Sequence, residues 1–424
     1  MSRLRADTLA NLAAFGVMGV SGVVLNLFVV ALSGKDALGV FNQVYAGYLI
    51  ISMLAVFGVH DAVYREVAAN PSRPDLQRES LASGLRLVFA TGAVASVLMF
   101  VSAAPIGAFV DSEQVGRGLR LVAPALLLFA INKVLMASLA GHGRLQAFAI
   151  VQTVRILTLV SVVVGLAASG AAAGTLALGF GAAEVGIVPI LVGLLRPSLS
   201  AGTGDHVREH LAFGARALPH GFVAESFLRV DVLMLAPLAD DAAIGVYSLA
   251  AMFAEGLVQL GGTVRSVLGP RLVPTLAPDG DRAQRRRLLR QAMGLGLGMF
   301  AVVAAGLVLL FPWLGRLIDP VGVDQAYDVL LVLLVGLAAN AAFFPLNQLL
   351  LWAGRPGGQS VMMSVNLGLN VVLNGALIPP LGVTGAALAT ACAWALSAVV
   401  SNGAAWMGLG FRWGIVGEAL SRDR

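Results

Sequence analysis

The sequence predicts an all-α, polytopic membrane protein with twelve transmembrane helices arranged in two six-helix lobes. Of its 424 residues, 58% are hydrophobic and only 12% are charged, whereas an ordinary soluble protein carries about 25% charged residues. Twelve apolar stretches follow one another with short polar breaks, and short motifs recur between the two halves. A soluble enzyme, a nucleic-acid-binding protein and a disordered chain are excluded, because none could cover its surface with so few charges.

A helix that crosses the hydrocarbon core of a bilayer needs about 20 apolar residues, and this length defines the predicted spans. In the predicted N-lobe, residues 1–200, the spans are 9–32, 38–60, 81–103, 118–139, 147–168 and 172–195. In the predicted C-lobe, residues 201–424, the spans are 212–238, 243–268, 291–312, 326–350, 358–379 and 383–408. The first stretch exceeds the roughly 7–15 apolar residues of a cleavable signal, so it is predicted to remain as a span.

Basic residues predict the orientation, because Lys and Arg accumulate in cytoplasmic loops. With the N-terminus inside, four basic residues fall on the outer side: Lys35, Arg117, Arg120 and Arg316. Nearly all the others fall at the inner side or its boundary. Both termini are therefore predicted to be cytoplasmic.

An internal repeat relates the two halves. Ala37-Leu-Gly-Val-Phe41 matches Ala243-Ile-Gly-Val-Tyr247 at an offset of 206 residues, and at the same offset Arg65 matches Arg271. Alanine and glycine are abundant enough to match by chance, so the aligned arginines carry more weight. Six spans per lobe is an even number, so the repeat is parallel. Its axis runs along the membrane normal, an arrangement that favours a transport site at the midplane between the lobes.

Apart from residues assigned to the inner or outer boundary, eight Asp, Glu, Lys and Arg residues fall inside the predicted spans, where each costs roughly 2.5–3.5 kcal/mol on insertion scales and needs a partner or a wet cavity. They are Lys133, Arg155, Glu184, Glu225, Arg229, Asp231, Glu255 and Arg265. Lys133 and Arg265 lie near inner ends, where snorkelling to water explains them as well as function does. Arg155 lies roughly 12 Å into its span by helical rise, too deep for that explanation.

Two interpretations of the deep charges stay open. Glu225, Arg229 and Asp231 form an internal ion-pair cluster in one interpretation; in the other, Arg155 and Arg229 line a cavity and bind an anionic head group through the planar guanidinium fork. The predicted substrate-binding residues are Arg155, Arg229, Asp231, Lys133, Arg265, Asn366 and Asn370. The predicted ion-coupling residues are Glu184, Glu255 and Glu225. Asn366, Asn370 and Asn374 form one helical stripe, which hydrogen bonding between helices explains equally well.

Motifs for nucleotide, metal or covalent chemistry are not found in the sequence. There is no phosphate-binding G-x-x-x-x-G-K-[ST] loop, so transport is predicted to be secondary or driven by the membrane potential. His206 and His210 have metal-like spacing but no third ligand, and a solvated cytoplasmic helix explains them better. The run Arg282-Ala-Gln-Arg-Arg-Arg287 is predicted to determine topology and to contact anionic lipid. The protein is therefore predicted to be no enzyme and to need no cofactor or metal.

Two pairs of neighbouring spans resemble a known family. Spans 7 and 8 read Arg229-Val-Asp-Val-Leu-Met-Leu235 and then Ile244-Gly-Val-Tyr-Ser-Leu-Ala250. Spans 11 and 12 read Asn366-Leu-Gly-Leu-Asn370, Leu377-Ile-Pro379 and then Gly382-Val-Thr-Gly-Ala-Ala387. These motifs and their order resemble the polysaccharide-exporter, or lipid-linked oligosaccharide flippase, branch of the multidrug/oligosaccharidyl-lipid/polysaccharide exporter superfamily. The likeness covers nearly the whole chain.

The resemblance implies a flippase of the bacterial plasma (inner) membrane that moves an undecaprenyl-diphosphate-linked glycan outward by alternating access, for surface polysaccharide synthesis. It implies a lipid-linked glycan and membrane lipids as partners, a polysaccharide polymerase or glycosyltransferases as candidate partners, and no nucleic acid. It also implies that Arg155 and Arg229 bind the diphosphate-sugar region. The chain lacks the two extra spans of lipid II flippases, which makes that substrate less expected.

The alternatives are a multidrug and toxin extrusion antiporter, a major-facilitator transporter and a non-transporting membrane scaffold. The antiporter predicts an acidic cavity, whereas the eight deep charges are half basic. The major-facilitator loop motif is incomplete in Gly58-Val-His-Asp-Ala-Val-Tyr-Arg65. A scaffold has no need for deep arginines.

Overall fold

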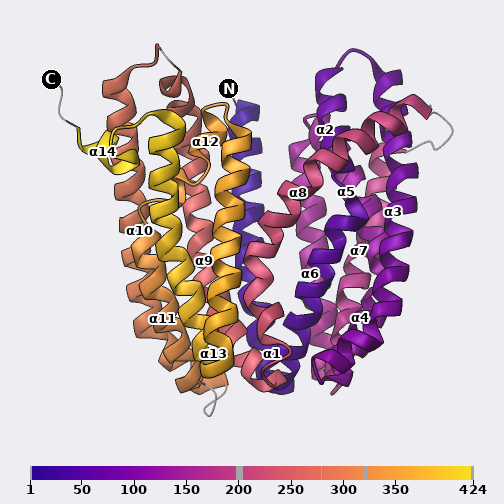
Figure 1. Cartoon of the computed structure of the whole chain (residues 1–424). Coiled ribbons are helices and arrows are strands. Elements are labelled where there is room, and N and C mark those ends of the chain that lie inside the picture. Colours follow the sequence, from indigo (N-terminus) through magenta and orange to yellow (C-terminus); the bar gives the residue numbers. More distant parts are fainter. Residues whose placement is uncertain (1, 197–203, 278, 319–322, 422–424) are drawn as a thin grey trace. The chain divides into compact units, whose positions relative to one another are not determined.

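The computed structural model describes the backbone of residues 2–196, 204–277, 279–318 and 323–421, and every regular element in these ranges is a helix. Long apolar stretches without exposed polar faces fold this way because a helix satisfies all its backbone hydrogen bonds internally. Figure 1 labels the elements along the chain. They are α1 (Ser2–Val56), α2 (Val59–Ala69), α3 (Pro74–Phe109), α4 (Glu113–Val122), α5 (Ala125–Gly141), α6 (Leu145–Ala168), η1 (Ala173–Ala177), α7 (Leu178–Leu195), α8 (Gly204–Leu235), α9 (Asp241–Leu272), η3 (Val273–Leu276), α10 (Arg282–Ile318), α11 (Val323–Asn340), η4 (Phe344–Leu346), α12 (Leu349–Trp352), α13 (Pro356–Leu409) and α14 (Gly414–Leu420).

Seven of the described helices are long and apolar enough to cross a membrane, and nine spans result if each of two bent helix pairs is counted as one. The bent pairs are α4 with α5, at 46°, and α11 with the segment Phe344–Trp352, at 56°. Pro124 directly precedes α5 and Pro345 lies within η4, and proline interrupts a helix because it lacks the backbone N–H. The chain is therefore a multi-pass membrane protein.

Two of the longest helices are each interrupted by one glycine. Gly34 in α1 has φ 85° and ψ 172°, and Gly382 in α13 has φ 56° and ψ −130°. A positive φ strains every residue with a Cβ, so glycine is the residue that permits these reversals. Both breaks lie between predicted spans.

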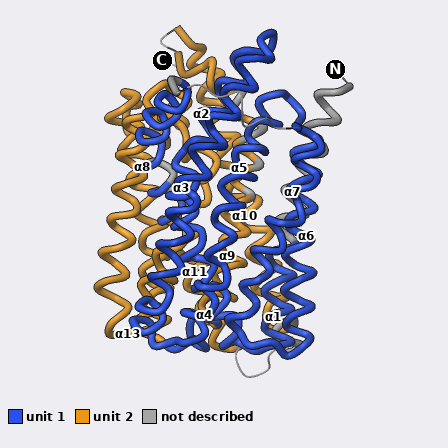
Figure 2. Tube along the Cα trace, turned by 90° about the vertical axis from the view of Figure 1, so that its right-hand side faces the viewer, with its two compact units in different colours: residues 1–226, 240–245 blue, residues 227–239, 246–424 orange. Residues whose placement is uncertain are grey.

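The chain divides into two compact units, which Figure 2 colours separately. Unit 1 contains residues 1–226 and 240–245, and unit 2 contains residues 227–239 and 246–424. In unit 1, α1 packs against α6, α3 against α4 and α5, and α6 against α7. In unit 2, α11 packs against α13, and α10 packs against α11 and α14.

The start of α9 belongs to unit 1, where two glycines of the predicted repeat meet. A Cβ at Gly39 would overlap the backbone oxygen of Asp241, and a Cβ at Gly245 would overlap that of Lys35. The Asp241 carboxylate accepts hydrogen bonds from Gln43 Nε2 at 2.6 Å and from Ser112 Oγ, between α3 and α4, at 2.7 Å. The repeat motif 37–41 and its copy 243–247 thus supply the residues that let these helices touch backbone to backbone.

Candidate functional site

The first candidate site lies in unit 1 and contains Arg155 on α6. Its Nη2 lies 2.5 Å from Glu184 Oε1, and its Nε donates to the same oxygen at 2.8 Å. The Arg155 side chain is 24% exposed, whereas the Glu184 side chain is 2% exposed. Helices α6 and α7 run side by side (Figure 1), which brings together residues 29 positions apart. The buried carboxylate therefore holds the guanidinium of a side chain that is itself partly exposed.

Asn132 on α5 fixes the other side of that carboxylate. Its Nδ2 donates to Glu184 Oε2 at 2.9 Å and to the Glu184 backbone oxygen at 2.9 Å. Asn132 is 1% exposed, so these bonds form away from water, where a lost partner leaves the full desolvation cost of the remaining group. Asn132 and Glu184 together set the position of Arg155.

Phe129 forms an aromatic wall beside the same cluster. The Arg155 guanidinium lies 5.0 Å from the ring centroid and Lys133 Nζ lies 5.9 Å from it, distances at which a cation is attracted to the ring face. Phe129 and Lys133 share one face of α5 because four residues separate them. Lys133 also interacts electrostatically with four charged groups: Arg155, Asp61, Glu184 and Glu225.

The second candidate site lies in unit 2 and contains Asp231 on α8, which is 7% exposed. Its carboxylate accepts a short hydrogen bond from the Tyr247 hydroxyl of α9, a 3.4 Å bond from Thr390 Oγ1 of α13, and a 2.9 Å bond from the Val232 backbone N–H. Tyr247 is fully buried. Two neutral hydroxyl groups therefore bond this carboxylate, and Arg229, two residues earlier, interacts with it electrostatically.

Arg229 lies two residues before Asp231. Its Nη1 lies 3.5 Å from Glu255 Oε1, with the two side chains 16% and 31% exposed. The Arg229 charge also acts on the buried Asp231 carboxylate, so the structure brings Arg229, Glu255 and Asp231 together in unit 2.

The remaining predicted residues of unit 2 make polar contacts inside it. Arg265 Nη1 donates to Asn347 Oδ1 at 2.7 Å. Asn366 Nδ2 donates to Ser397 Oγ, in the part of α13 after Gly382, at 3.1 Å. Asn374 Nδ2 donates to Asn370 Oδ1 at 2.5 Å. All three asparagines are buried. Hydrogen bonding therefore accounts for at least part of the amide stripe.

Sequence reasoning missed five residues of these clusters: Asn132, Phe129, Tyr247, Thr390 and Asn347. A neutral polar or aromatic side chain in an apolar span does not by itself indicate a functional site. Two signals could have found some of them: Asn132 directly precedes Lys133, and the repeat motif ends at Tyr247.

The histidine pair His206 and His210 contacts Glu66 of α2 rather than water alone. His210 Nε2 lies 3.1 Å from Glu66 Oε2 and His206 Nε2 lies 3.3 Å from Glu66 Oε1. The prediction of a solvated helix was wrong for His210, which is 2% exposed. The hydrogen bond from His210 lowers the pKa of the Glu66 carboxyl. Among the described residues, no group of three His, Cys, Asp or Glu side chains is placed to hold a metal ion.

The fold is similar to that of MOP superfamily transporters, which agrees with the apolar helices of a multi-pass membrane protein. The structure is similar to lipid II flippase MurJ in an inward closed conformation, with TM-score 0.77 and 13% identity over 93% of this chain and 86% of that one. It is similar to an inward-facing multidrug resistance MATE family transporter, with TM-score 0.70 and 13% identity over 90% and 92%. A MOP superfamily transporter from Pyrococcus furiosus gives TM-score 0.61 and 14% identity over 94% and 93%.

The chain belongs to the family described as polysaccharide biosynthesis protein, whose model matches residues 32–310. This confirms the resemblance found in the sequence. No curated protein matches the chain. The similar structures named above are a lipid II flippase and transporters.

Proposed function

We propose that the protein is a flippase that moves an undecaprenyl-diphosphate-linked oligosaccharide or polysaccharide repeat unit from the inner to the outer leaflet of the bacterial plasma membrane by alternating access. The glycan then serves the synthesis of a cell-surface polysaccharide such as O-antigen, capsule or exopolysaccharide. Membership of the polysaccharide biosynthesis family supports the glycan, and the likeness of the fold to a lipid II flippase supports the translocation step.

The observation that carries the proposal is the state of Arg155. A guanidinium among apolar helices is costly unless it has partners, and here Glu184 holds it at 2.5 Å while a quarter of the side chain stays exposed. A rigidly held, accessible guanidinium suits a diphosphate, because its planar fork donates two parallel hydrogen bonds to phosphate oxygens. Arg229, with its longer 3.5 Å contact to Glu255, is the second proposed diphosphate ligand.

The other predicted residues keep their proposed roles around these two arginines. The further substrate contacts are Asp231, Lys133, Arg265, Asn366 and Asn370, and the proposed proton or cation sites are Glu184, Glu255 and Glu225. Glu184 has a second role in this proposal, because its bonds to Arg155 and Asn132 position the guanidinium.

An anionic substrate fits these charges better than the cation of a multidrug antiporter does. A cationic substrate needs an accessible carboxylate, whereas Glu184 is 1% exposed and bonded to Arg155 and Asn132, and Asp231 is buried beneath two hydroxyl groups. In the Arg155–Glu184 pair of unit 1 the cation is the more exposed member, at 24% against 2%, which favours phosphate over ammonium there. In the Arg229–Glu255 pair of unit 2 the carboxylate is the more exposed member, at 31% against 16%.

We infer the architecture of twelve spans in two lobes, residues 1–200 and 201–424, with both termini cytoplasmic. Nine spans follow from the apolar helices and bent pairs. Dividing α1 at Gly34 and α13 at Gly382 adds two, and α8, whose charged residues reduce its hydropathy, adds the twelfth. A polysaccharide polymerase or glycosyltransferases are the proposed protein partners, since they consume or supply the lipid-linked glycan.

The test is glycan export in cells that depend on this protein. Arg155→Ala and Arg229→Ala should each block export, measured as loss of surface polysaccharide with accumulation of lipid-linked precursor, in membranes that still contain the folded variant. Arg155→Lys keeps a cation for the buried Glu184 but lacks the planar fork, so it separates loss of the phosphate contact from loss of the ion pair. Arg120→Ala is the matched control, because Arg120 is exposed at the end of α4 and takes no part in the contacts described for either cluster. Wild-type export by both variants would remove the arginine site.

A further inference from the structure

The arginine-rich start of α10, in unit 2, remains unexplained by the proposed transport site. Five arginines fall within nine residues: Arg282, Arg285, Arg286, Arg287 and Arg290. Of these, Arg282, Arg287 and Arg290 are exposed, and we refer to these three as the arginine face. Arg285, in contrast, is largely buried.

Arg285 is bonded inside the structure. Its Nη2 and Nε donate to Glu418 Oε1 of α14 at 2.6 and 2.9 Å, and its Nη1 donates to the Thr275 backbone oxygen at 3.1 Å. The guanidinium also lies 5.1 Å from the ring centroid of Phe411. With the two side chains 11% and 12% exposed, this pair fastens α14 to α10 and leaves the arginine face without that carboxylate.

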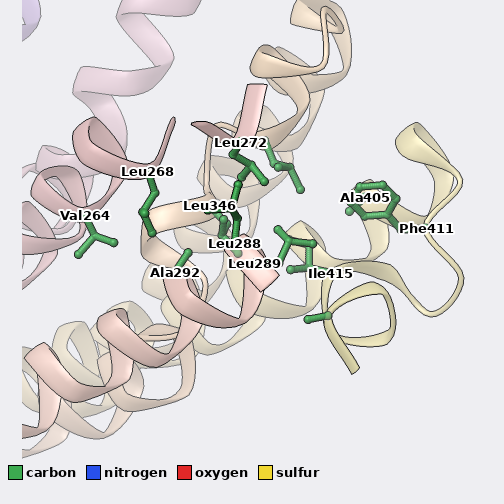
Figure 3. Close-up of a cluster of buried hydrophobic side chains, with 12 residues drawn as sticks. Val264, Leu268, Leu272, Leu288, Leu289, Ala292, Leu346, Ala405, Phe411 and Ile415 are labelled. Atoms are coloured by element: carbon green, nitrogen blue, oxygen red, sulfur yellow. The ribbon is translucent and has the colours of Figure 1, made fainter. Parts of the chain in front are cut away.

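The side of α10 opposite Arg287 and Arg290 is buried in a hydrophobic cluster, which fixes the direction of these two side chains. Leu288, Leu289 and Ala292 point into the same cluster as Phe411 and Ile415 (Figure 3). Leu289 and Ile415 are at most 1% exposed. Because α10 is packed on this side, its opposite face, which carries Arg287 and Arg290, points away from the hydrophobic cluster.

Exposed apolar side chains continue from the arginine face along α10. Leu297 is 46% exposed and Val302 is 74% exposed, as expected for a helix surface that faces lipid tails. Near α14, Trp413 is 73% exposed and Leu420 is 69% exposed. Tryptophan concentrates where lipid headgroups meet the hydrocarbon, so the arginine face lies at headgroup depth.

Acidic groups do not neutralise this face completely. Asp279 and Asp281 precede α10 and are exposed, and the Asp281 carboxylate accepts the Gln284 backbone N–H at 3.1 Å, as a helix N-cap. Arg287 and Arg290 lie three residues apart, so they are neighbours on the helix surface. Two adjacent guanidinium forks at headgroup depth match the phosphate group of a lipid.

We propose that the arginine face binds the phosphate headgroup of an anionic phospholipid of the cytoplasmic leaflet. Each basic residue near an anionic membrane surface adds to the attraction, and the guanidinium forks of Arg287 and Arg290 direct it to the phosphate. The bound lipid is a partner of unit 2 and is distinct from the transported glycan.

The test counts lipids that stay bound to the delipidated, detergent-solubilised full chain after addition of phosphatidylglycerol or phosphatidylcholine, by native mass spectrometry. The wild type should retain phosphatidylglycerol preferentially. In Arg287→Gln/Arg290→Gln the ratio of bound phosphatidylglycerol to bound phosphatidylcholine should fall about tenfold. Arg282→Gln should lose a smaller part. Because these side chains are exposed, melting temperatures should be unchanged.

The matched control is Arg117→Gln/Arg120→Gln, which removes two exposed arginines with the same three-residue spacing on α4. This variant should keep the wild-type preference. The proposal is overturned if the α10 variant keeps the preference or if the α4 variant loses as much. Displacement of the lipid by soluble glycerol phosphate at the same headgroup concentration would also overturn it, because the site would then take free phosphate.

Discussion

Unit 1 and unit 2 each place an arginine and carboxylates among apolar helices, and they satisfy these charges in opposite ways. In unit 1, Glu184 bonds Arg155 directly at 2.5 Å and is itself held by Asn132. In unit 2, Arg229 lies 3.5 Å from Glu255, and Asp231 accepts hydrogen bonds from two hydroxyl groups. The Arg155–Glu184 contact is therefore short and buried, whereas the Arg229–Glu255 contact is longer and more exposed.

This difference teaches which residues are costly to change. A buried ion pair contributes little net stability, yet removing one partner leaves an uncompensated charge. The 2% exposure of the Glu184 side chain places unit 1 in that regime, and the 31% exposure of Glu255 places its pair close to the behaviour of a surface pair. Loss of a partner should thus destabilise unit 1 far more.

The largest expected effect follows Glu184→Ala. It leaves the Arg155 guanidinium without its carboxylate and removes one of the two acceptors of the Asn132 amide, so the free energy of unfolding should fall by about 3–5 kcal/mol. Denaturant unfolding of the purified protein in detergent micelles measures this. Glu184→Gln, which keeps an acceptor oxygen in place, should lose less; equal losses would show that the charge pairing with Arg155 decides the cost.

A smaller effect should follow Tyr247→Phe in unit 2. The variant removes the hydroxyl that donates to the buried Asp231 carboxylate, and an unsatisfied buried group costs about 1–3 kcal/mol. The same unfolding measurement applies, with Tyr64→Phe as control, because Tyr64 is 47% exposed. Unchanged stability would mean that the hydroxyl cluster does not support unit 2.

Glu66 provides a comparison outside the spans, where pH can reach the carboxylate. Its pKa is lowered from the ordinary 4.5, first by the hydrogen bond from His210. A carboxyl whose pKa is lower in the folded state contributes stability above its unfolded pKa and loses it as pH falls through the folded value. Stability should therefore decline below about pH 4.5, and Glu66→Gln should flatten this decline in melting curves. An identical acid profile for both proteins would exclude the contribution.

The smallest effect should follow Glu255→Gln. Its contact with Arg229 is long and a third of its side chain is exposed, so the unfolding free energy should change by less than about 1 kcal/mol. A loss as large as that of Glu184→Ala would contradict the proposed difference between the units. Transport by this variant, measured in parallel, separates a role in ion coupling from a structural one.

Much of the helical layout could be predicted from the sequence, because apolar length is a property of each segment alone. The glycines that interrupt α1 and α13 fall where short polar breaks separate the predicted spans. The bend between α4 and α5 was not predicted, although Pro124 marks it. The repeat motif also identified Gly39 and Gly245, whose contact requires that neither carry a Cβ.

The partners of the buried charges could not be predicted, because they depend on how helices face one another. Glu184 lies 29 residues from Arg155, and the sequence does not state which helix face each occupies. Glu255, which contacts Arg229, lies 26 residues further along the chain on the next helix, and the i, i+4 pairing expected between Glu225 and Arg229 stays a prediction. Likewise, His210 is buried because α8 packs against α2 and α3 at this point.

The most direct measurement of the central claim is translocation by the purified protein in sealed vesicles. A fluorescent undecaprenyl-diphosphate-linked oligosaccharide is placed in one leaflet, and its appearance in the other is followed by quenching from outside. The account predicts rapid translocation by the wild type and loss of at least about tenfold of the rate in Arg155→Ala, as expected when a charge-assisted contact with phosphate is removed. Equal rates for the two proteins, or no acceleration by the wild type over protein-free vesicles, would contradict it.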